Sequence, residues 1–394
     1  MKILVLSFYY QPDLSAGSFR ATALVDALRQ QMPPESTIHV VTTLPNRYRT
    51  YTVDAPKIES HEGVIVHRVT LPAHKSGMLD QSQAFMVFAW RVLDHVASKE
   101  YDVVFATSSR LMTAVLAAWI ASKKKTRLYL DIRDIFVDTM EDVLPRYLAM
   151  TAGPLFGMLE RWAINKANKV NLVSRGFAEY FTARYRSKDF TYFTNGIDEE
   201  FVAASYVNQI DKSAKKSTVS VLYAGNIGEG QGLHAILPDL ARRMSGKMCF
   251  RIIGDGGRKD ALQAGLAAHG IENVEILPPV SRDQLIKEYQ DADVLFLHLN
   301  DHEAFKKVLP SKLFEYAAMG KPIWAGVSGY AASFVRSEIT NAAVFNPCSA
   351  DEAERVFDDL IIHVSGREEF LKKYSRRNIM EKMAMDIVGL NKEK

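Results

Sequence analysis

Cysteine and long apolar runs are scarce in this sequence, and both shortages narrow what the protein can be. The two cysteines, Cys249 and Cys348, lie far apart without a CxxC or His-Cys spacing, so neither a zinc site nor a disulfide framework has support. This favours a reducing compartment. No run approaches the roughly 20 apolar residues that span a bilayer. The opening MKILVLSFYY lacks the pattern of a secretion signal and predicts a first strand, so we expect a cytoplasmic protein.

An excess of charge of one sign is also missing. The formal net charge is +3, with 24% charged and 47% hydrophobic residues, which excludes a disordered chain and argues against a dedicated nucleic-acid binder. The balance is that of a globular enzyme. At 394 residues the chain exceeds what one hydrophobic core usually supports, so we expect two domains.

Short apolar runs alternate with longer segments of helical period along almost the whole chain. This pattern predicts an α/β protein with parallel sheets that are covered by helices on both faces. The first series of expected strands is KILVLSFY, TIHVVT, VIVHRV, DVVFAT, RLYLDI, KVNLVS and TYFT. The second series is VSVLYAG, CFRIIG, VEILPP, DVLFLHL, PIWAG and AAVFNP. Ligands of such sheets bind beyond the carboxyl ends of the strands, so two facing sheets would form a cleft.

The best candidate for a linker lies between the two series, at residues 201–218, where the apolar period gives way to Ser, Lys and Asp. It separates an expected N-terminal Rossmann-like domain, residues 1–200, from a C-terminal one, residues 219–366. Residues 367–394 have one long polar helical pattern with several methionines. We expect this segment to pack back onto the N-terminal domain.

Two glycine-rich loops follow neighbouring strands of the second series. The loop YAGNIGEGQGL contains Gly225 and Gly228, and the loop IIGDGGRKDAL contains Gly254 and Asp255. Glycine lets backbone N–H groups approach an anion without a Cβ in the way, and a following helix N-terminus favours negative charge. The alternative is ordinary turn chemistry, which Gly-Asp-Gly also favours.

The stretch LPSKLFEYAAMGKPI predicts a short helix whose start faces a ligand. Pro310 is suited to a helix start and would leave the N–H groups of Ser311, Lys312 and Leu313 without helical partners. The Lys312 ammonium suits a phosphate, and the Glu315 carboxylate, three residues on, could accept the hydroxyls of a ribose. The alternative is a surface Lys–Glu pair of about 0.3 to 0.5 kcal/mol.

Two further stretches of the first half have charged or polar residues directly after a strand. In PDLSAGSFRA, Gly17 could bring N–H groups near an anion or the loop could be a plain helix cap. In LYLDIRDIFVD, Asp131, Arg133 and Asp134 follow an apolar strand, where sites of open sheets collect. The alternative for these three charges is an internal ion-pair network.

Taken together, these motifs resemble those of the retaining GT-B glycosyltransferases of family 4, over essentially the whole chain. The resemblance is carried by YAGNIGEGQGL, IIGDGGRKDAL, YQDADVLFLHL, LPSKLFEYAAMGKPIWAG, TNGID and LSAGSFRA. PSKLFEY and DIRD are most similar to the branch of bacterial O-antigen, capsule and exopolysaccharide assembly, which includes N-acetylfucosamine transferases. The resemblance implies two Rossmann-like domains, a nucleotide-sugar bound mainly by the C-terminal one, a saccharide acceptor bound mainly by the N-terminal one, and chemistry that needs neither a metal ion nor a cofactor.

Residue by residue, the resemblance makes Glu315 the second glutamate of an E-x7-E element that holds the ribose. The first glutamate is replaced by Lys307, and Glu303 is a candidate substitute. The family commonly has an arginine and a lysine where this chain has Asn226 and Gln231. Without that arginine and lysine, the bound diphosphate would have fewer cations around it. Lys312, the helix N-terminus at Pro310 and the glycine loops would then have to stabilise more of its charge. The donor-binding residues that we expect are Gly17, Gly225, Asn226, Gly228, Gln231, Gly254, Asp255, Lys307, Ser311, Lys312, Leu313 and Glu315.

We expect catalytic roles for Lys312, which stabilises the leaving diphosphate, and for Arg133 and Asp134, which orient the acceptor or the sugar. A nucleotide-sugar epimerase or dehydrogenase is a rival, but it should carry GxGxxG directly after the first strand, and SFYYQPDLSAGS does not. A two-lobed binding protein is another, but it should carry an export signal. AFMVFAWRVL and the basic KKKTR suggest peripheral contact with the cytoplasmic face of the inner membrane, although helix packing and a solvated charge run explain them about as well.

Overall fold

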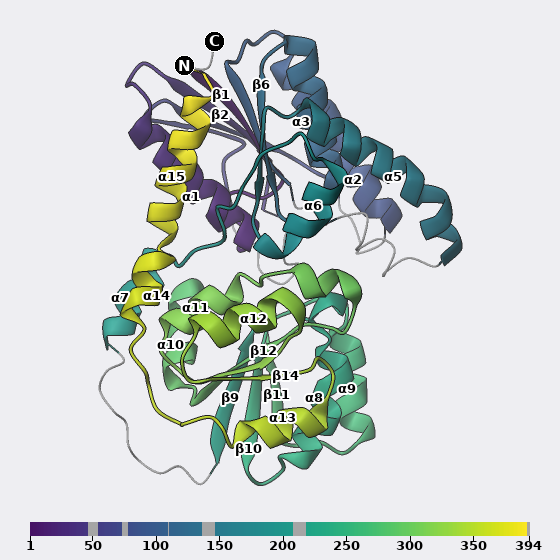
Figure 1. The fold of residues 1–394 in the computed structure, drawn as a ribbon, viewed down its shortest axis with the longest axis vertical. Coiled ribbons are helices and arrows are strands. Elements are labelled where there is room, and N and C mark those ends of the chain that lie inside the picture. Colours follow the sequence, from purple (N-terminus) through teal and green to yellow (C-terminus); the bar gives the residue numbers. More distant parts are fainter. Residues whose placement is uncertain (46–53, 73–77, 109, 136–145, 208–217, 392–394) are drawn as a thin grey trace. The chain divides into compact units, whose positions relative to one another are not determined.

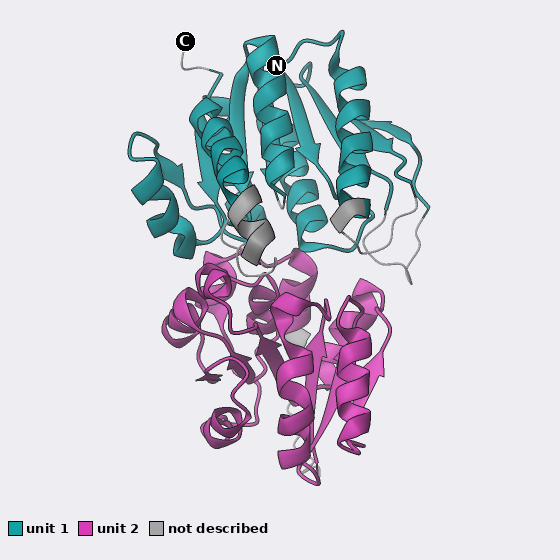
Figure 2. Ribbon diagram, turned by 90° about the vertical axis from the view of Figure 1, so that its right-hand side faces the viewer, with its two compact units in different colours: residues 1–195, 376–394 teal, residues 196–375 magenta. Residues whose placement is uncertain are grey.

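The computed structural model describes residues 1–45, 54–72, 78–108, 110–135, 146–207 and 218–391, and it divides them into two compact units. Unit 1 comprises residues 1–195 and 376–394, and unit 2 comprises residues 196–375 (Figure 2). Each unit has one sheet with helices packed on it. No helix in the described ranges is long and apolar enough to cross a membrane.

The sheet of unit 1 has eight strands in the order β3-β4-β2-β1-β5-β6-β7-β8, and all neighbours are parallel except β3 and β4. The strands are β1 (Lys2–Ser7), β2 (Thr37–Thr43), β3 (Ile58–His61), β4 (Val64–Val69), β5 (Val103–Ser108), β6 (Arg127–Ile132), β7 (Lys169–Leu172) and β8 (Phe190–Thr191). The central strands are buried, which matches their near-continuous apolar sequences. The apolar runs of the sequence did not predict β3, whose four residues are all exposed.

Helices lie on both faces of this sheet. The helical segments in the described residues of unit 1 are α1 (Ala16–Gln31), α2 (Met78–Val96), α3 (Leu111–Lys124), α5 (Arg146–Lys166), η1 (Arg175–Phe177), α6 (Ala178–Arg184) and α15 (Arg376–Gly389). Helices α1 and α15 lie side by side and share one hydrophobic core with β1 and β2 (Figure 1). Helices α2, α3 and α5 form a layer over the sheet (Figure 2).

The sheet of unit 2 has six parallel strands in the order β11-β10-β9-β12-β13-β14. The strands are β9 (Val219–Ala224), β10 (Met248–Ile253), β11 (Val274–Leu277), β12 (Val294–His298), β13 (Ile323–Gly326) and β14 (Ala342–Phe345). All six coincide with the second series of expected strands. The doubly wound α/β fold that the alternating pattern predicts is thus present in both units.

Two hydrophobic clusters cover the two faces of the unit 2 sheet. The helical segments of unit 2 are α7 (Glu199–Val207), η2 (Glu229–Gln231), α8 (Leu233–Arg243), α9 (Lys259–Ala268), α10 (Arg282–Asp291), η3 (Glu303–Lys307), α11 (Lys312–Ala318), α12 (Gly329–Glu338), α13 (Ala350–Phe357) and α14 (Glu368–Lys373). One cluster includes α8, α9 and α13, and the other includes α7, α11, α12 and α14.

The chain passes between the units at positions that differ from the expected domain limits. The expected linker, residues 201–218, begins inside α7, which is part of unit 2 because Phe201 and Ala204 are buried in its core. Residues 208–217 of that linker lie outside the described residues. The expected single C-terminal segment, residues 367–394, is two helices: α14 belongs to unit 2, and only α15 packs on α1 of unit 1. The division falls between Ser375 and Arg376.

Candidate active site

The two glycine-rich loops of unit 2 lie against each other where neighbouring strands β9 and β10 end. Gly225, with a φ of 142°, donates its N–H to Ile253 O at 2.8 Å, and Ile227 N–H reaches Asp255 O at 2.9 Å. A Cβ on Gly254, whose φ is 157°, would collide with the carbonyl oxygen of Gly225. Only glycine permits this contact, so the two loops that the sequence singled out form one surface at the carboxyl edge of the sheet.

Asn226 and Gln231 hold the first loop in shape. The side-chain amide of Asn226 donates to Gln231 Oε1 at 2.8 Å, and the Gly228 N–H points to the same oxygen at 3.3 Å. The Gln231 carbonyl oxygen in turn lies 2.7 Å from His298 Nδ1, at the end of β12. Both predicted residues are therefore at the loop, but their side chains bond to each other.

His298 was missed by the sequence analysis, although it links two loops of unit 2. Its side chain is buried, and the Cys348 N–H donates to its Nε2 at 2.9 Å. Nδ1 must then carry the proton and donate to Gln231 O, which fixes the tautomer. Burial lowers the pKa of His298 to about 4, so the ring stays neutral. The single histidine in DVLFLHL was the only signal for this role.

Lys312 extends across the first loop. Its ammonium lies 4.0 Å from the centre of the Tyr223 ring, and a side chain at Gly225 would collide with it. Burial lowers the pKa of Lys312 to about 7, although the Glu315 carboxylate acts in the opposite direction. Among the described residues no carboxylate forms an ion pair with Lys312, so its cation is stabilised mainly by the face of Tyr223.

Glu315 is held by different partners from those of Lys312. The Tyr289 hydroxyl donates to Glu315 Oε2 at 3.1 Å, and the charge of Arg282 lies nearby. Arg282 is itself fixed by ion pairs with Asp198 and, at 2.6 Å, with Glu200. The surface Lys312–Glu315 pair that the sequence left open as an alternative does not form, because the two side chains reach different neighbours.

The helix start differs in detail from the prediction. Lys312 is the first residue of α11, and Ser311 precedes it without a capping hydrogen bond from its side chain. The Leu313 N–H donates to Pro310 O at 3.2 Å, so it is not available to a ligand as predicted. The turn before the helix, η3, places Glu303 in an exposed ion pair with Lys306, one residue before Lys307.

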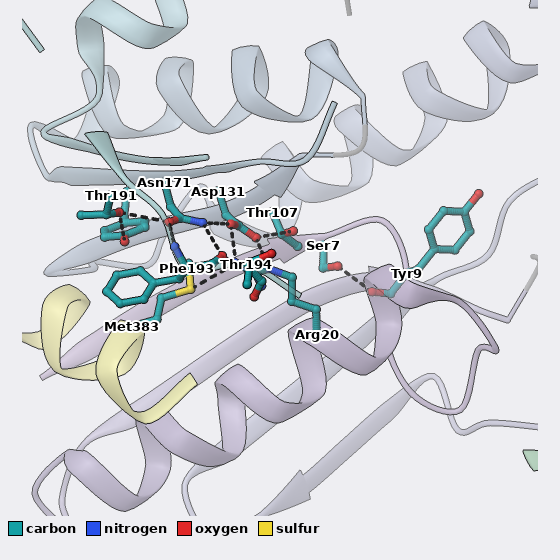
Figure 3. Close-up of polar contacts among 11 residues, drawn as sticks. Ser7, Tyr9, Arg20, Thr107, Asp131, Asn171, Thr191, Phe193, Thr194 and Met383 are labelled. Carbon is teal, nitrogen blue, oxygen red and sulfur yellow. Dashed lines mark hydrogen bonds and ion pairs between the residues drawn. The ribbon is translucent and has the colours of Figure 1, made fainter. Parts of the chain in front are cut away.

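Charged residues of unit 1 gather at the carboxyl end of β6, where Asp131 is completely buried (Figure 3). Arg20 donates to both of its carboxylate oxygens, at 2.8 and 2.9 Å, and Thr107 and Asn171 donate at 3.0 and 2.8 Å. Burial alone would raise the pKa of Asp131, but the charge and hydrogen bonds of Arg20 hold it below its usual value. For Asp131 the internal network is therefore the correct alternative.

Arg20 was also missed, although it lies in the motif LSAGSFRA. Besides Asp131 it donates to the carbonyl oxygens of Phe193 and Thr194, at 2.7 and 2.8 Å, and it contacts Met383 of α15 (Figure 3). One guanidinium thus joins α1, β6, the TNGID segment and the C-terminal helix. In the sequence, the only indication that Arg20 has a buried role is its position as a charged residue in the first turns of an amphipathic helix.

Arg133 and Asp134 lie directly after β6, as predicted, but they face different surroundings. The Arg133 guanidinium lies against Gly17, where a Cβ would meet it, and its Nε is buried without a hydrogen-bond partner among the described residues. Burial, with the neighbouring charge of Arg20, lowers the pKa of Arg133 to about 10.

Asp134 lines a small, mainly apolar cavity with space for about one water molecule. Burial raises the pKa of Asp134 to about 6, and the charge of Arg133 opposes that shift. Glu160 lines the same cavity and accepts hydrogen bonds from the hydroxyls of Tyr180 and Tyr185, at 3.2 and 2.7 Å. The described residues contain no group of three His, Cys, Asp or Glu side chains that could hold a metal ion.

Two models of known protein families together match most of this chain. Residues 19–196 match the family model of the glycosyl transferase 4-like domain, and residues 208–377 match that of the glycosyl transferases group 1. The chain is a GT-B glycosyltransferase. The glycine loops and Lys312 lie in the group 1 domain, whereas Arg133 and Asp134 lie in the 4-like domain.

Three known proteins illustrate the relationship of this glycosyltransferase. WcaI of Escherichia coli (strain K12), whose name assigns it to colanic acid biosynthesis as a glycosyl transferase, is 25% identical over 339 residues, 81% of this chain and 82% of WcaI. Sucrose-phosphate synthase of Thermosynechococcus elongatus has a TM-score of 0.73 at 12% identity and 100% coverage of both chains. Anabaena Alr3699/HepE, solved with UDP and glucose, has a TM-score of 0.64 at 17% identity and covers 100% of this chain and 98% of its own. The last two likenesses establish the fold alone.

Proposed function

We propose that this glycosyltransferase is a retaining enzyme that transfers a sugar from a UDP-linked donor to a saccharide, or to a saccharide carried on a polyprenyl lipid, in the assembly of a bacterial surface polysaccharide. The name of WcaI supports the pathway, and the UDP bound to Anabaena HepE supports the nucleotide. The resemblance to N-acetylfucosamine transferases makes an N-acetylated sugar the first donor to try. The observation that carries the proposal is the Lys312 ammonium, half-buried over Tyr223 without a carboxylate partner in the described chain.

The proposed donor site follows from the polar groups around that ammonium. Lys312 and the loops at Gly225 and Gly254 would bind the diphosphate. The arginine and lysine common in the family are absent from this site, because this chain has Asn226 and Gln231 at those positions, and these two side chains bond to each other. Glu315, already held by Tyr289, would accept the hydroxyls of the ribose. Ser311 adds the hydroxyl next to Lys312. Lys307 stands in place of the family's first glutamate.

In the proposed reaction the bond between the anomeric carbon and the phosphate oxygen breaks while the acceptor oxygen bonds to the same face of the sugar. The departing phosphate oxygen takes the proton of the acceptor hydroxyl, which balances the step without a dedicated protein base. Such a reaction depends on stabilising the charge that develops on the diphosphate. We propose that Lys312 supplies this stabilisation and that no metal ion is needed.

Arg133 and Asp134 are the proposed acceptor-orienting residues. With a pKa of about 6, Asp134 is mostly ionised at neutral pH and could accept a hydrogen bond from an acceptor hydroxyl. In the part of the chain that the structure describes, the buried Nε of Arg133 has no hydrogen-bond partner, and the guanidinium lies next to Gly17. We expect Arg133→Gln to raise the KM for the acceptor by about tenfold, a loss of roughly 1.4 kcal/mol, while the KM for the donor changes little.

The proposal is tested by incubating the purified protein with a panel of UDP- and GDP-linked sugars and detecting the released nucleotide. We expect turnover with a UDP-sugar, unchanged rates in the presence of EDTA, and a product whose anomeric configuration, read by NMR, equals that of the donor. Binding of NAD without nucleotide-sugar turnover would favour a dehydrogenase or epimerase. Saccharide binding without any turnover would favour a two-lobed binding protein.

A further inference from the structure

Exposed apolar side chains are unusually concentrated on one layer of unit 1. Of the ten large hydrophobic residues that are exposed in the described chain, six lie on the adjacent helices α2, α3 and α5. They are Met86, Trp90, Met112, Trp119, Leu155 and Met158. Single exposed apolar residues need no explanation, but a group on neighbouring helices marks an interaction surface.

Helical spacing places these residues on the outer faces of their helices. Met86 and Trp90, exposed by 63% and 60%, are four residues apart on α2, and the neighbouring Phe88 is buried in the unit. Met112 and Trp119 are seven apart on α3, and Leu155 and Met158 are three apart on α5. Each pair therefore shares one face of its helix. We call the surface that these six residues form the outer helical face.

Cations accompany both tryptophans of the outer helical face. The Arg91 guanidinium lies 4.8 Å from the centre of the Trp90 ring, and the Lys123 ammonium lies 5.7 Å from that of Trp119. From Leu111 to Arg127 the sequence contains Lys123, Lys124, Lys125 and Arg127 and no acidic residue. On α5, Glu160 points away from this face, because it is buried and bonded to Tyr180 and Tyr185. Asp80 and Asp94 on α2 are the opposing charges.

We propose that the outer helical face docks on an anionic lipid surface. Tryptophan and methionine side chains enter the headgroup region, where amphipathic rings are favoured, while the arginine and lysine heads contact lipid phosphates. Charge selects this occupant: a second copy of the chain would bring the same cluster of cations against itself. The inference rests on the proposed function in one respect, because a polyprenyl-linked acceptor is itself held in a membrane and the enzyme would have to bind there to reach it.

The interaction has two separable parts, one apolar and one electrostatic. Each lysine or arginine near an anionic membrane strengthens binding by about fivefold, and added salt weakens this part. The apolar part depends on the two indole rings and is less sensitive to salt. Removing either part should therefore weaken binding by at least about tenfold.

The experiment measures co-sedimentation of the full chain with vesicles of phosphatidylcholine alone or mixed equally with phosphatidylglycerol, at low and high salt. Two double variants test the two parts: Trp90→Ser with Trp119→Ser, and Lys123→Gln with Lys125→Gln. The matched control is Met385→Ser with Lys382→Gln, an exposed apolar residue and an exposed cation of α15. Circular dichroism and thermal melting check that every variant is folded.

We expect binding to the mixed vesicles only, with a loss of at least about tenfold in each test variant and none in the control. Absence of sedimentation by the wild type, or an equal loss in the control, would overturn the proposal. Lipid-independent self-association of the wild type that the tryptophan variant abolishes would instead identify a second copy as the occupant. Because sedimentation needs no donor, failure of sugar transfer with vesicle binding intact would count against the proposed function and not against this surface.

Discussion

Asp131 in unit 1 and Lys312 in unit 2 are both charges withdrawn from water at the carboxyl edge of a parallel sheet, yet their surroundings are opposite. Asp131 receives hydrogen bonds from Arg20, Thr107 and Asn171, so its charge is balanced within the protein. Lys312 has the face of Tyr223 and no ion pair among the described residues. The pKa values reflect this, because that of Asp131 is lowered towards the charged form whereas that of Lys312 is lowered to about 7, away from it.

The comparison teaches that position at the sheet edge does not by itself identify a binding residue. A charge whose hydrogen bonds are already made contributes to the fold, and truncating it leaves its partners buried and unpaired. A charge that the protein leaves partly uncompensated gains its partner from a ligand, so truncating it costs binding and not stability. The following predictions test this distinction.

The largest effect is expected for Asp131→Ala, which leaves the guanidinium of Arg20 buried without its carboxylate. We expect a loss of about 3 to 5 kcal/mol in the free energy of unfolding, measured by urea denaturation. Asp94→Ala, an exposed aspartate of the same unit, is the control and should change stability by less than about 0.5 kcal/mol. If Asp131→Ala cost no more than its control, the network would not be the structural element described here.

Lys312→Met is the converse experiment, because methionine keeps much of the side chain's length and removes its charge. We expect the rate of nucleotide release from the donor to fall by at least about tenfold, or roughly 1.4 kcal/mol of transition-state stabilisation. Thermal stability should stay equal or rise, since a half-buried charge without a carboxylate partner is removed. A Lys312→Met variant that is destabilised but fully active would show that Lys312, like Asp131, stabilises the fold and does not bind the donor.

The sequence was a good guide to the strands and a poor guide to the network around Asp131. Buried parallel strands appear as continuous apolar runs, so all the strands of unit 2 were predicted, whereas the exposed β3 has no such run. Glycines after β9 and β10 mark loops that approach each other closely, a local signal. Arg20 and Asp131 are 111 residues apart, and nothing local indicates which charges a fold will pair.

The same limit applies to α7 and to Tyr289. The expected linker was placed from residue 201 because of the Ser, Lys and Asp content further along the segment, yet Phe201 and Ala204 are buried in the core and anchor α7 in unit 2. Tyr289 lies 26 residues before Glu315 on a different helix, so its hydroxyl could not be assigned as a partner from spacing. Side chains that meet across elements require the packed structure.

Glu315 and Tyr289 allow a ligand-binding residue to be separated from the residue that positions it. Glu315→Ala should reduce transfer by at least about tenfold, because the proposed ribose contact is lost. Tyr289→Phe removes only the hydroxyl that holds the carboxylate, so we expect about a threefold increase in the KM for the donor with kcat unchanged. Steady-state kinetics with varied donor concentration distinguishes the two. Equal effects of both substitutions on kcat would show that Tyr289 does more than position Glu315.

The last prediction concerns pH, and it separates a charge that awaits a ligand from one that is already paired. With a pKa of about 7, free Lys312 is charged below that pH and neutral above it, whereas a bound diphosphate favours the ammonium and raises its pKa. Nucleotide binding above about pH 7 must therefore take up a proton, and the Kd for UDP should rise by up to about tenfold per pH unit until the pKa of the complex is reached. Below about pH 7 the Lys312 contribution should be constant. Titration calorimetry in buffers of different ionisation enthalpy measures both the Kd and the proton uptake. Lys312→Met controls for ionisation of the nucleotide itself, and a wild-type profile no steeper than that of this variant would mean that the ammonium does not bind the diphosphate.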